Sequence, residues 1–159
     1  GVERARAAVG GLAAGAGIGG AGESAKEIAR LGNGAPAAGM FGEDARTALA
    51  TDPKPSLHPR CISPHPGEAA RLLGQQTAEV QADRFSAVRS LSQWGPALLK
   101  GRHTLVCGET LTINRTGTPA LATAGSGDVL TGVVGAFVAQ GLSHIAALLR
   151  AASVHGLPG

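Results

Sequence analysis

The stretch that decides the fold is Gly117-Thr118-Pro119-Ala120-Leu121-Ala122-Thr123-Ala124-Gly125-Ser126-Gly127-Asp128-Val129-Leu130-Thr131-Gly132, in which small residues lead into an apolar helical pattern. Gly125 and Gly127 let the backbone approach a ligand closely, and the first turn of a helix offers unpaired N–H donors and a positive dipole end to an anion. Asp128 then places a carboxylate where a phosphate oxygen or a ligand hydroxyl would lie. The alternative is that Ser126 or Asp128 merely caps the helix, and the stretch taken alone favours that alternative.

Two helices are expected after this stretch. Apolar residues recur at helical spacing from Val129 to Val138, and Gln140-Gly141 ends the pattern. Ser143 is expected to cap the next helix. His144 and His155 lie in or beside that second pattern, where we expect structural roles.

Upstream, His65 follows a short strand predicted at residues 60–63. In an open parallel sheet the carboxyl ends of the strands are where ligands bind, and an imidazole can donate to a hydroxyl or a phosphate. The alternative is that Pro66 and Glu68 simply begin the helix whose apolar part covers residues 69–73.

Lys100 ends another predicted strand, at residues 97–100, and is followed by Gly101-Arg102-His103-Thr104. A lysine beside a glycine at a strand end can reach a phosphate, although a solvated turn is the alternative. Residues 105–107 and 111–114 resume an extended pattern across a turn and predict an antiparallel pair.

The remaining chain supplies scaffold. Residues 77–93 predict one helix with Ala78, Ala82, Phe85, Val88 and Leu91 in the core, and with Gln81, Arg84 and Arg89 outside. Residues 7–14 predict a buried strand that leads into a glycine-rich turn at residues 15–20 and a helix at 23–31. Between residues 35 and 59 no strong strand is predicted, and residues 44–50 predict at most a helical turn or two.

Composition narrows the class of protein. The chain has 159 residues, 43% hydrophobic and 3% aromatic, with 25 glycines, which suits a glycine-looped α/β protein. Its net charge is +3, but Lys and Arg alternate with acids, so we expect no nucleic-acid binding. No apolar run approaches the roughly 18 residues of a membrane span, so no membrane partner is expected.

The number and spacing of the cysteines favour an intracellular protein. Cys61 and Cys107 are too few for a disulfide framework, which favours a reduced, cytoplasmic setting. No His, Cys or acid cluster has the spacing of a structural metal site, so no protein-held metal is predicted.

The order of these motifs closely resembles that of the nucleotide-dependent NAD(P)H-hydrate dehydratases, a branch of the ribokinase-like superfamily. The motifs that carry the resemblance are Pro64-His65-Pro66-Gly67-Glu68, Lys100-Gly101 with Thr104, residues 117–132, Ala139-Gln140-Gly141-Leu142 and His155-Gly156-Leu157. The resemblance implies an α/β fold with an open, mostly parallel sheet and helices on both faces. Compared with the family pattern, residues 1–159 are expected to form a single partial domain, truncated at the amino end and with an incomplete carboxyl-terminal helix.

The same resemblance implies a hydro-lyase that repairs damaged cofactor. ADP or ATP, assisted by Mg²⁺, would phosphorylate the hydroxyl of hydrated NADH or NADPH, and the phosphate would then be eliminated. Asp128 is the expected catalytic base. The residues implied for the hydrated cofactor are Gly17, His65 and Asp128. Those implied for the nucleotide are Lys100, Gly101, Arg102, His103, Thr104, Gly125, Ser126 and Gly127.

Two other functions share these motifs. A ribokinase-like kinase acting on a thiazole or pyrimidine alcohol would use the same anion loop and base. A catalytically inactive remnant would bind nucleotide or nothing. In each case the partners are small molecules. A homo-oligomer is also an option, because a domain without the family's amino-terminal strand–helix units would leave apolar faces exposed.

Overall fold

The computed structural model of the protein describes residues 39–41 and 60–157. Within them lie the strands β1 (Gly39–Phe41), β2 (Arg60–Ile62), β3 (Ala97–Leu99), β4 (Leu105–Cys107) and β5 (Leu111–Ile113). The helices are α4 (Pro66–Leu73), α5 (Thr77–Ala82), α6 (Arg84–Leu91), α7 (Ser126–Ala139) and α8 (His144–His155), with short 3₁₀ turns at Ser92–Trp94 and Pro119–Leu121. Gly17 and the elements predicted at residues 7–14, 15–20, 23–31 and 44–50 lie outside the described residues.

The five described strands form one sheet in the order β1-β2-β3-β4-β5. β1, β2 and β3 run parallel, while β3, β4 and β5 pair antiparallel, so the described sheet is mixed. The antiparallel pair expected from the sequence is confirmed, with Leu105 opposite Ile113 and Cys107 opposite Leu111.

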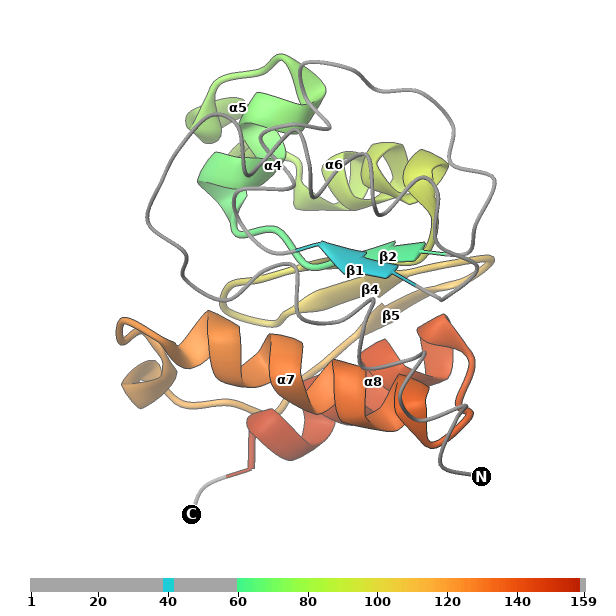
Figure 1. Ribbon diagram of the computed structural model, residues 1–159. Coiled ribbons are helices and arrows are strands. Elements are labelled where there is room, and N and C mark those ends of the chain that lie inside the picture. The colour runs from blue at the N-terminus through green and yellow to red at the C-terminus, as the bar shows by residue number, and fades with distance from the viewer. Residues whose placement is uncertain (1–38, 42–59, 158–159) are drawn as a thin grey trace, which may run out of the picture.

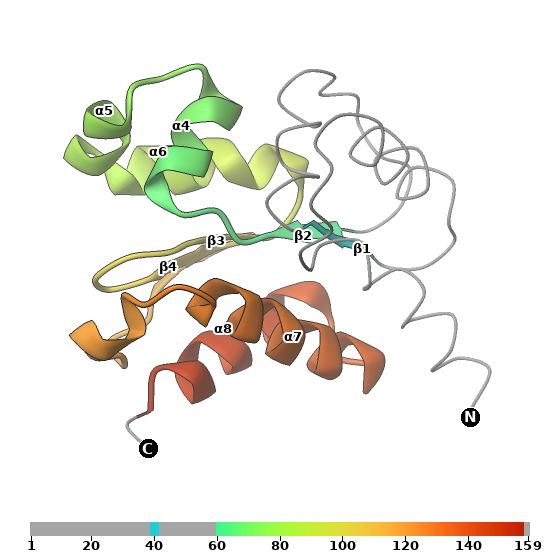
Figure 2. The same ribbon diagram turned by 60° about the vertical axis from the view of Figure 1, so that its left-hand side comes forward.

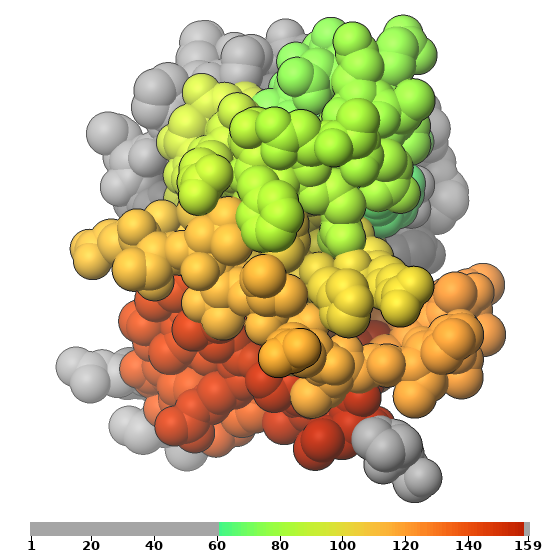
Figure 3. Space-filling model, turned by 180° about the vertical axis from the view of Figure 1, so that it is seen from behind, coloured from blue at the N-terminus to red at the C-terminus, as the bar shows by residue number. Residues whose placement is uncertain are grey.

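Helices cover both faces of this sheet, as expected for the fold class. Figures 1 and 2 show α4, α5 and α6 above the sheet and α7 and α8 below it. In Figure 3 the segment that includes β4 and β5, coloured yellow to orange, lies between the two helical layers on the opposite side of the molecule. The strands therefore lie at the centre of a three-layer sandwich, and their ends can carry a site.

Successive side chains along each strand point to opposite faces of the sheet, so the strands contribute to two separate core clusters. Ile62, Ala97, Leu99, Leu105 and Cys107 pack with α4, α5 and α6 on one face. Cys61, Leu98 and Val106, which are their neighbours in sequence, pack with α7 and α8 on the other face. Short, fully apolar strands are the sequence signature of a sheet that is buried on both faces.

β1 is a correction to the sequence analysis, which predicted no strong strand between residues 35 and 59. Gly39, Met40 and Phe41 pair in parallel with Arg60, Cys61 and Ile62. A short strand with a glycine has weak intrinsic β propensity, so its pairing partner decides its conformation rather than its own sequence.

The prediction of a single helix at residues 77–93 is also wrong, because the helix is interrupted at Asp83 and divides into α5 and α6. Asp83 has φ −135° and ψ 76°, and its carboxylate accepts the Ser86 N–H at 3.0 Å, which caps α6. The predicted core face changes with the break: Ala78, Ala82 and Phe85 are exposed, Val88 and Leu91 are buried, and Val80 and Ala87 join them. An aspartate that binds backbone N–H groups competes with helix continuation.

The two helices after the glycine-rich stretch form as predicted. α7 ends at Ala139, and Ser143 caps α8 by accepting the Ala146 N–H at 3.4 Å. Among the helices of the described residues, none is both long and apolar enough to cross a membrane.

Candidate active site

The first part of the site is the start of α4, which follows β2 directly. His65 is the N-cap residue, and its Nδ1 accepts the N–H groups of Gly67 at 3.0 Å and Glu68 at 3.3 Å. The Glu68 carboxylate returns to accept the His65 N–H at 2.5 Å, which completes a capping box. The helix-start interpretation of this motif is therefore confirmed as local structure.

This cap also determines which nitrogen of the His65 ring can act on a ligand. Since Nδ1 accepts two hydrogen bonds, the neutral ring must carry its proton on Nε2. Nε2 lies 3.6 Å from Glu68 Oε1, and the side chain is 44% exposed. His65 thus presents a fixed N–H donor at the carboxyl end of β2.

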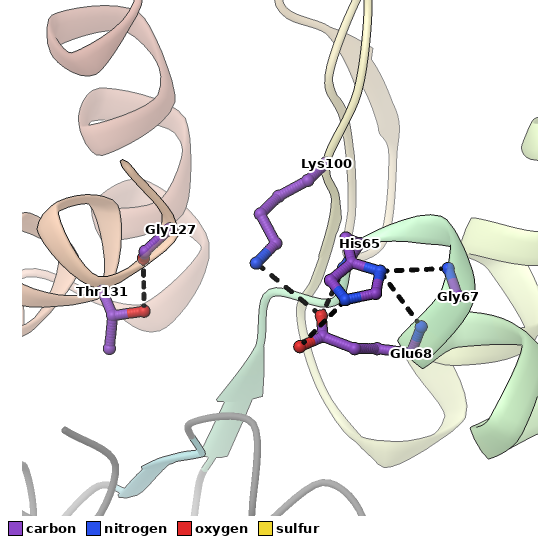
Figure 4. Close-up of polar contacts among 6 residues, drawn as sticks. All are labelled: His65, Gly67, Glu68, Lys100, Gly127 and Thr131. Carbon is purple, nitrogen blue, oxygen red and sulfur yellow. Dashed lines mark hydrogen bonds and ion pairs between the residues drawn. The ribbon is translucent and has the colours of Figure 1, made fainter. Parts of the chain in front are cut away.

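Lys100 brings a cation to the same edge from the end of β3. Its backbone N–H donates to the Pro64 carbonyl at 2.9 Å, which ties the ends of β2 and β3 together. Its Nζ lies 3.6 Å from Glu68 Oε2 (Figure 4). The Glu68 side chain is only 2% exposed, and a carboxylate buried to this degree needs a cationic partner.

Sequence reasoning missed the Glu68–Lys100 pair. The sequence pattern indicates only that Glu68 lies at the start of a helix. Glu68 and Lys100 are also far apart along the chain, so no local pattern joins them. The signal that could have found the pair is the position of Glu68, one helical turn beyond His65 at the same sheet edge where Lys100 ends its strand.

The loop after Lys100 has an unusual backbone. Gly101 has φ +137°, and His103 is a non-glycine residue with φ +53°. Thr104 Oγ1 donates to the Gly101 carbonyl at 3.0 Å, and the Thr104 carbonyl accepts the Asn114 N–H at 2.8 Å. The side chains of Arg102 and His103 are exposed, whereas the backbone of the predicted nucleotide loop accepts hydrogen bonds from Arg84, Thr104 and Asn114.

The start of α7 contradicts the capping alternative for residues 126 and 128. The N-cap is Gly125, with φ +84°, and no side chain of the described residues caps the helix. The Asp128 N–H donates to the Gly125 carbonyl at 3.0 Å, and the Asp128 side chain is exposed in the first turn. Among the described residues the Gly127 N–H has no acceptor, so it remains a donor at the positive end of the helix.

Ser126 has a partner that the sequence did not indicate. Its Oγ lies 3.3 Å from Nε2 of His155, the last residue of α8. The adjoining Gly156 packs against the backbone of Thr116 and Gly117, where a Cβ would lie 2.8 Å from the Thr116 carbonyl carbon. The end of α8 and the following glycine therefore contact both the start of the glycine-rich stretch, at Gly117, and the first residue of α7, Ser126.

These parts converge at Gly127. A Cβ placed on Gly127 would lie 3.0 Å from Lys100 Nζ, so the ammonium group faces the first turn of α7. Figure 4 shows Lys100 extended between Gly127 on one side and His65 and Glu68 on the other. The structure thus brings His65, Lys100 and Gly127 to one edge of the sheet, with Asp128 adjacent in the same helical turn.

The residues described at the site offer hydrogen-bond donors and few side chains that could bind a metal ion. Within the described residues, no group of three His, Cys, Asp or Glu side chains lies together in a way that could hold a metal ion. An open apolar depression between α7 and α8 is lined by Phe137, Leu149, Arg150, Ser153 and Val154. It includes none of the residues assigned to the site.

A family model described as NAD(P)H-hydrate dehydratase matches residues 42–159, which is most of the chain. The chain belongs to the NAD(P)H-hydrate dehydratase family. It is 44% identical over 124 residues to the bifunctional NAD(P)H-hydrate repair enzyme of Moorella thermoacetica, covering 73% of this chain and 23% of that protein. It is 46% identical over 99 residues to the ADP-dependent (S)-NAD(P)H-hydrate dehydratase of Neisseria meningitidis, covering 60% of this chain and 33% of that one.

A solved structure of this family has the same fold. The ADP/ATP-dependent NAD(P)H-hydrate dehydratase of Bacillus subtilis, crystallised with ATP and Mg²⁺, superposes with a TM-score of 0.76 at 28% identity. The superposition covers 86% of this chain and 50% of that one. The predicted ribokinase-like class is therefore confirmed, while the chain spans about half or less of the length of these relatives.

Proposed function

We propose that this chain carries the phosphoryl-transfer site of a nucleotide-dependent NAD(P)H-hydrate dehydratase. The observation that carries the proposal is the convergence of Lys100 Nζ on the first turn of α7 at Gly127, beside the fixed imidazole of His65. A cation and a helix N-terminus that face each other form a binding place for a phosphate group. The names of the relatives support ADP or ATP and hydrated NADH or NADPH as the substrates of this anion site.

In the proposed reaction Asp128 accepts the proton of the hydroxyl on the hydrated nicotinamide ring. The hydroxyl oxygen forms a bond to the terminal phosphorus while the bond from that phosphorus to the leaving nucleotide breaks. The carbon–oxygen bond then breaks with the phosphate as leaving group, and loss of a proton from the adjacent ring carbon restores the double bond. Asp128 is suited to the first step because its carboxylate is exposed and adjoins Gly127.

The other residues bind and stabilise charge in this proposal. The N–H of Gly127 and the ammonium of Lys100 neutralise the phosphoryl oxygens, with the backbone of Gly125 and Ser126 shaping the turn. Phosphoryl transfer depends mainly on positioning and on charge stabilisation. Gly101, Arg102, His103 and Thr104 complete the nucleotide loop, and His65 and Gly17 are assigned to the hydrated cofactor.

Mg²⁺ fits this arrangement as a companion of the nucleotide. Mg²⁺ is usually bound by one or two carboxylates together with substrate phosphates and waters, rather than by a protein cage. The nucleotide phosphates and waters would hold the ion, so the Asp128 carboxylate stays available to accept the proton. When bound, the ion would supply positive charge to the nucleotide phosphates.

We further propose a reducing, cytoplasmic setting and self-association. Both cysteines are free and buried, and burial raises the pKa of the Cys61 thiol to about 12, so this thiol is protected from oxidation. Val129, Val154 and Leu157 are exposed on or beside α7 and α8, at 59%, 52% and 60%. Exposed apolar side chains of this kind are suited to contact a second copy of the chain.

The test is recovery of reduced-nicotinamide absorbance from chemically hydrated NADPH in the presence of Mg²⁺ and ADP or ATP. Asp128→Asn should lower the turnover rate by about 10²–10⁴-fold, as expected for loss of a general base, while nucleotide binding is retained. Glu109→Gln is the matched control, because Glu109 is an exposed carboxylate in the β4–β5 turn, away from the site. Undiminished turnover in Asp128→Asn would remove Asp128 from the mechanism.

Product analysis separates the other two functions. A stable phosphorylated alcohol would identify a kinase, and nucleotide binding without any product would identify an inactive member of the family.

A further inference from the structure

Arg84, the first residue of α6, reaches across to the loop that follows β3. Its Nη1 donates to the Arg102 carbonyl, and its Nη2 lies 3.3 Å from the carbonyl oxygens of both Leu99 and Lys100. The sequence analysis placed Arg84 on the outside of a helix. The break at Asp83 starts α6 at Arg84 instead, and the guanidinium meets three carbonyl groups that are 15 to 18 residues away in sequence.

The guanidinium also lies against the part of the loop that has positive φ angles. A Cβ on Gly101 would lie 3.0 Å from Arg84 Nη2, so the guanidinium packs directly against the backbone of Gly101. Gly101 and His103 both have positive φ, which a non-glycine residue adopts only at an energetic cost. Such backbone persists when surrounding contacts determine it more strongly than the cost opposes it, and Arg84 supplies three of those contacts.

Peptide geometry links these contacts to the proposed anion site. In a trans peptide the C=O and the following N–H point in opposite directions, and the described residues contain no cis bond. Because the carbonyls of Lys100 and Arg102 face Arg84, the N–H groups of Gly101 and His103 face away from it. Among the residues that the structure describes, neither N–H has an acceptor, so both remain donors.

Arg84 brings a positive charge close to the loop. No carboxylate of the described residues lies within ion-pair distance of it, and burial lowers the pKa of its guanidinium, which stays charged. Its positive charge therefore adds to that of Lys100 on the loop.

We propose that Arg84 is a positioning residue of the nucleotide site: it binds the carbonyls of residues 99, 100 and 102 and thereby turns the N–H groups of Gly101 and His103 outward as donors to nucleotide phosphate. The inference rests on the proposed function, in which residues 100–104 bind ADP or ATP. It adds a residue that touches neither substrate and acts through the loop.

The test compares Arg84→Gln with Arg89→Gln. Arg89 is an exposed arginine on the same helix, so its replacement changes the net charge equally without touching the loop. Arg84→Gln should raise the Kd for ADP and the KM for ADP about tenfold or more, the equivalent of weakening one hydrogen bond to a charged group. The KM for hydrated NADPH should stay unchanged, and Arg89→Gln should match the wild type in all three constants.

Arg84→Lys separates positioning from charge. Lysine keeps the positive charge but lacks the planar fork that serves several carbonyls, so it should bind ADP almost as weakly as Arg84→Gln. Wild-type affinity in Arg84→Lys would overturn the inference, and so would an equal rise in both KM values for Arg84→Gln. If Arg84→Gln does not fold, as judged by circular dichroism, Arg84→Lys decides the question.

The wild-type protein distinguishes the two possible failures. A wild-type chain that binds no ADP refutes the proposed function and this inference together. A wild-type chain that binds ADP, beside an Arg84→Gln variant of equal affinity, refutes only the role of Arg84.

Discussion

Gly127→Ala should weaken the binding of ADP while leaving the free energy of unfolding nearly unchanged. The new Cβ would lie 3.0 Å from Lys100 Nζ, in the space where a phosphate oxygen would accept from both the Gly127 N–H and the ammonium group. Loss of a hydrogen bond to a charged group costs about 1.5–3 kcal/mol, which corresponds to a roughly 10–150-fold weaker Kd for ADP. Titration calorimetry with ADP measures this change.

The free energy of unfolding should change much less. Replacing glycine by alanine within a helix contributes about 0.5–1 kcal/mol of stability, and the displaced lysine end is flexible. The Lys100 ammonium needs to move only slightly to make room for the Cβ, so its pair with the buried Glu68 carboxylate should persist, and the net change measured by urea unfolding should stay within about 1 kcal/mol.

Gly132→Ala is the matched control for this substitution. Gly132 lies inside α7, and a Cβ there would meet nothing within 4 Å. This variant should gain about 1 kcal/mol of stability and bind ADP as the wild type does. If Gly127→Ala kept an affinity within about twofold of the wild type, which is less than 0.5 kcal/mol, the phosphate would not lie between Gly127 and Lys100, and the proposed site would be refuted.

Two further predictions concern α8. Gly156→Ala should lower the free energy of unfolding by about 1–3 kcal/mol in urea titrations, because its Cβ would lie 2.8 Å from the Thr116 carbonyl carbon and 2.9 Å from the Gly117 nitrogen; a loss below about 0.5 kcal/mol would contradict that packing. Burial lowers the pKa of His144, so the unfolded chain takes up the proton first, and stability should fall as the pH drops from about 6.5 towards the folded pKa. His144→Gln should flatten that part of the stability–pH curve, and an unchanged slope would exclude His144 as its source.

Much of the fold could be predicted from local patterns. The antiparallel strands of residues 105–107 and 111–113, the strand before Lys100, and the helices α7 and α8 all follow from apolar spacing and from their end signals. The break at Asp83 was missed because the helical periodicity of residues 77–93 continues across it. β1 was missed because it is short and begins with a glycine, so its pairing with β2 decides its conformation.

In the candidate site, too, the sequence predicted some features and the tertiary structure decided the others. The sequence by itself determined which chemistry was available, namely glycines before a helix, an acid in its first turn, and a histidine and a lysine after strands. Only the tertiary structure decided that Lys100 faces Gly127, that buried Glu68 pairs with Lys100, and that Arg84 binds the carbonyls of the loop. Periodicity reports which side of an element is buried, whereas these contacts join residues distant in sequence, and only the packing of helices against the sheet brings them together.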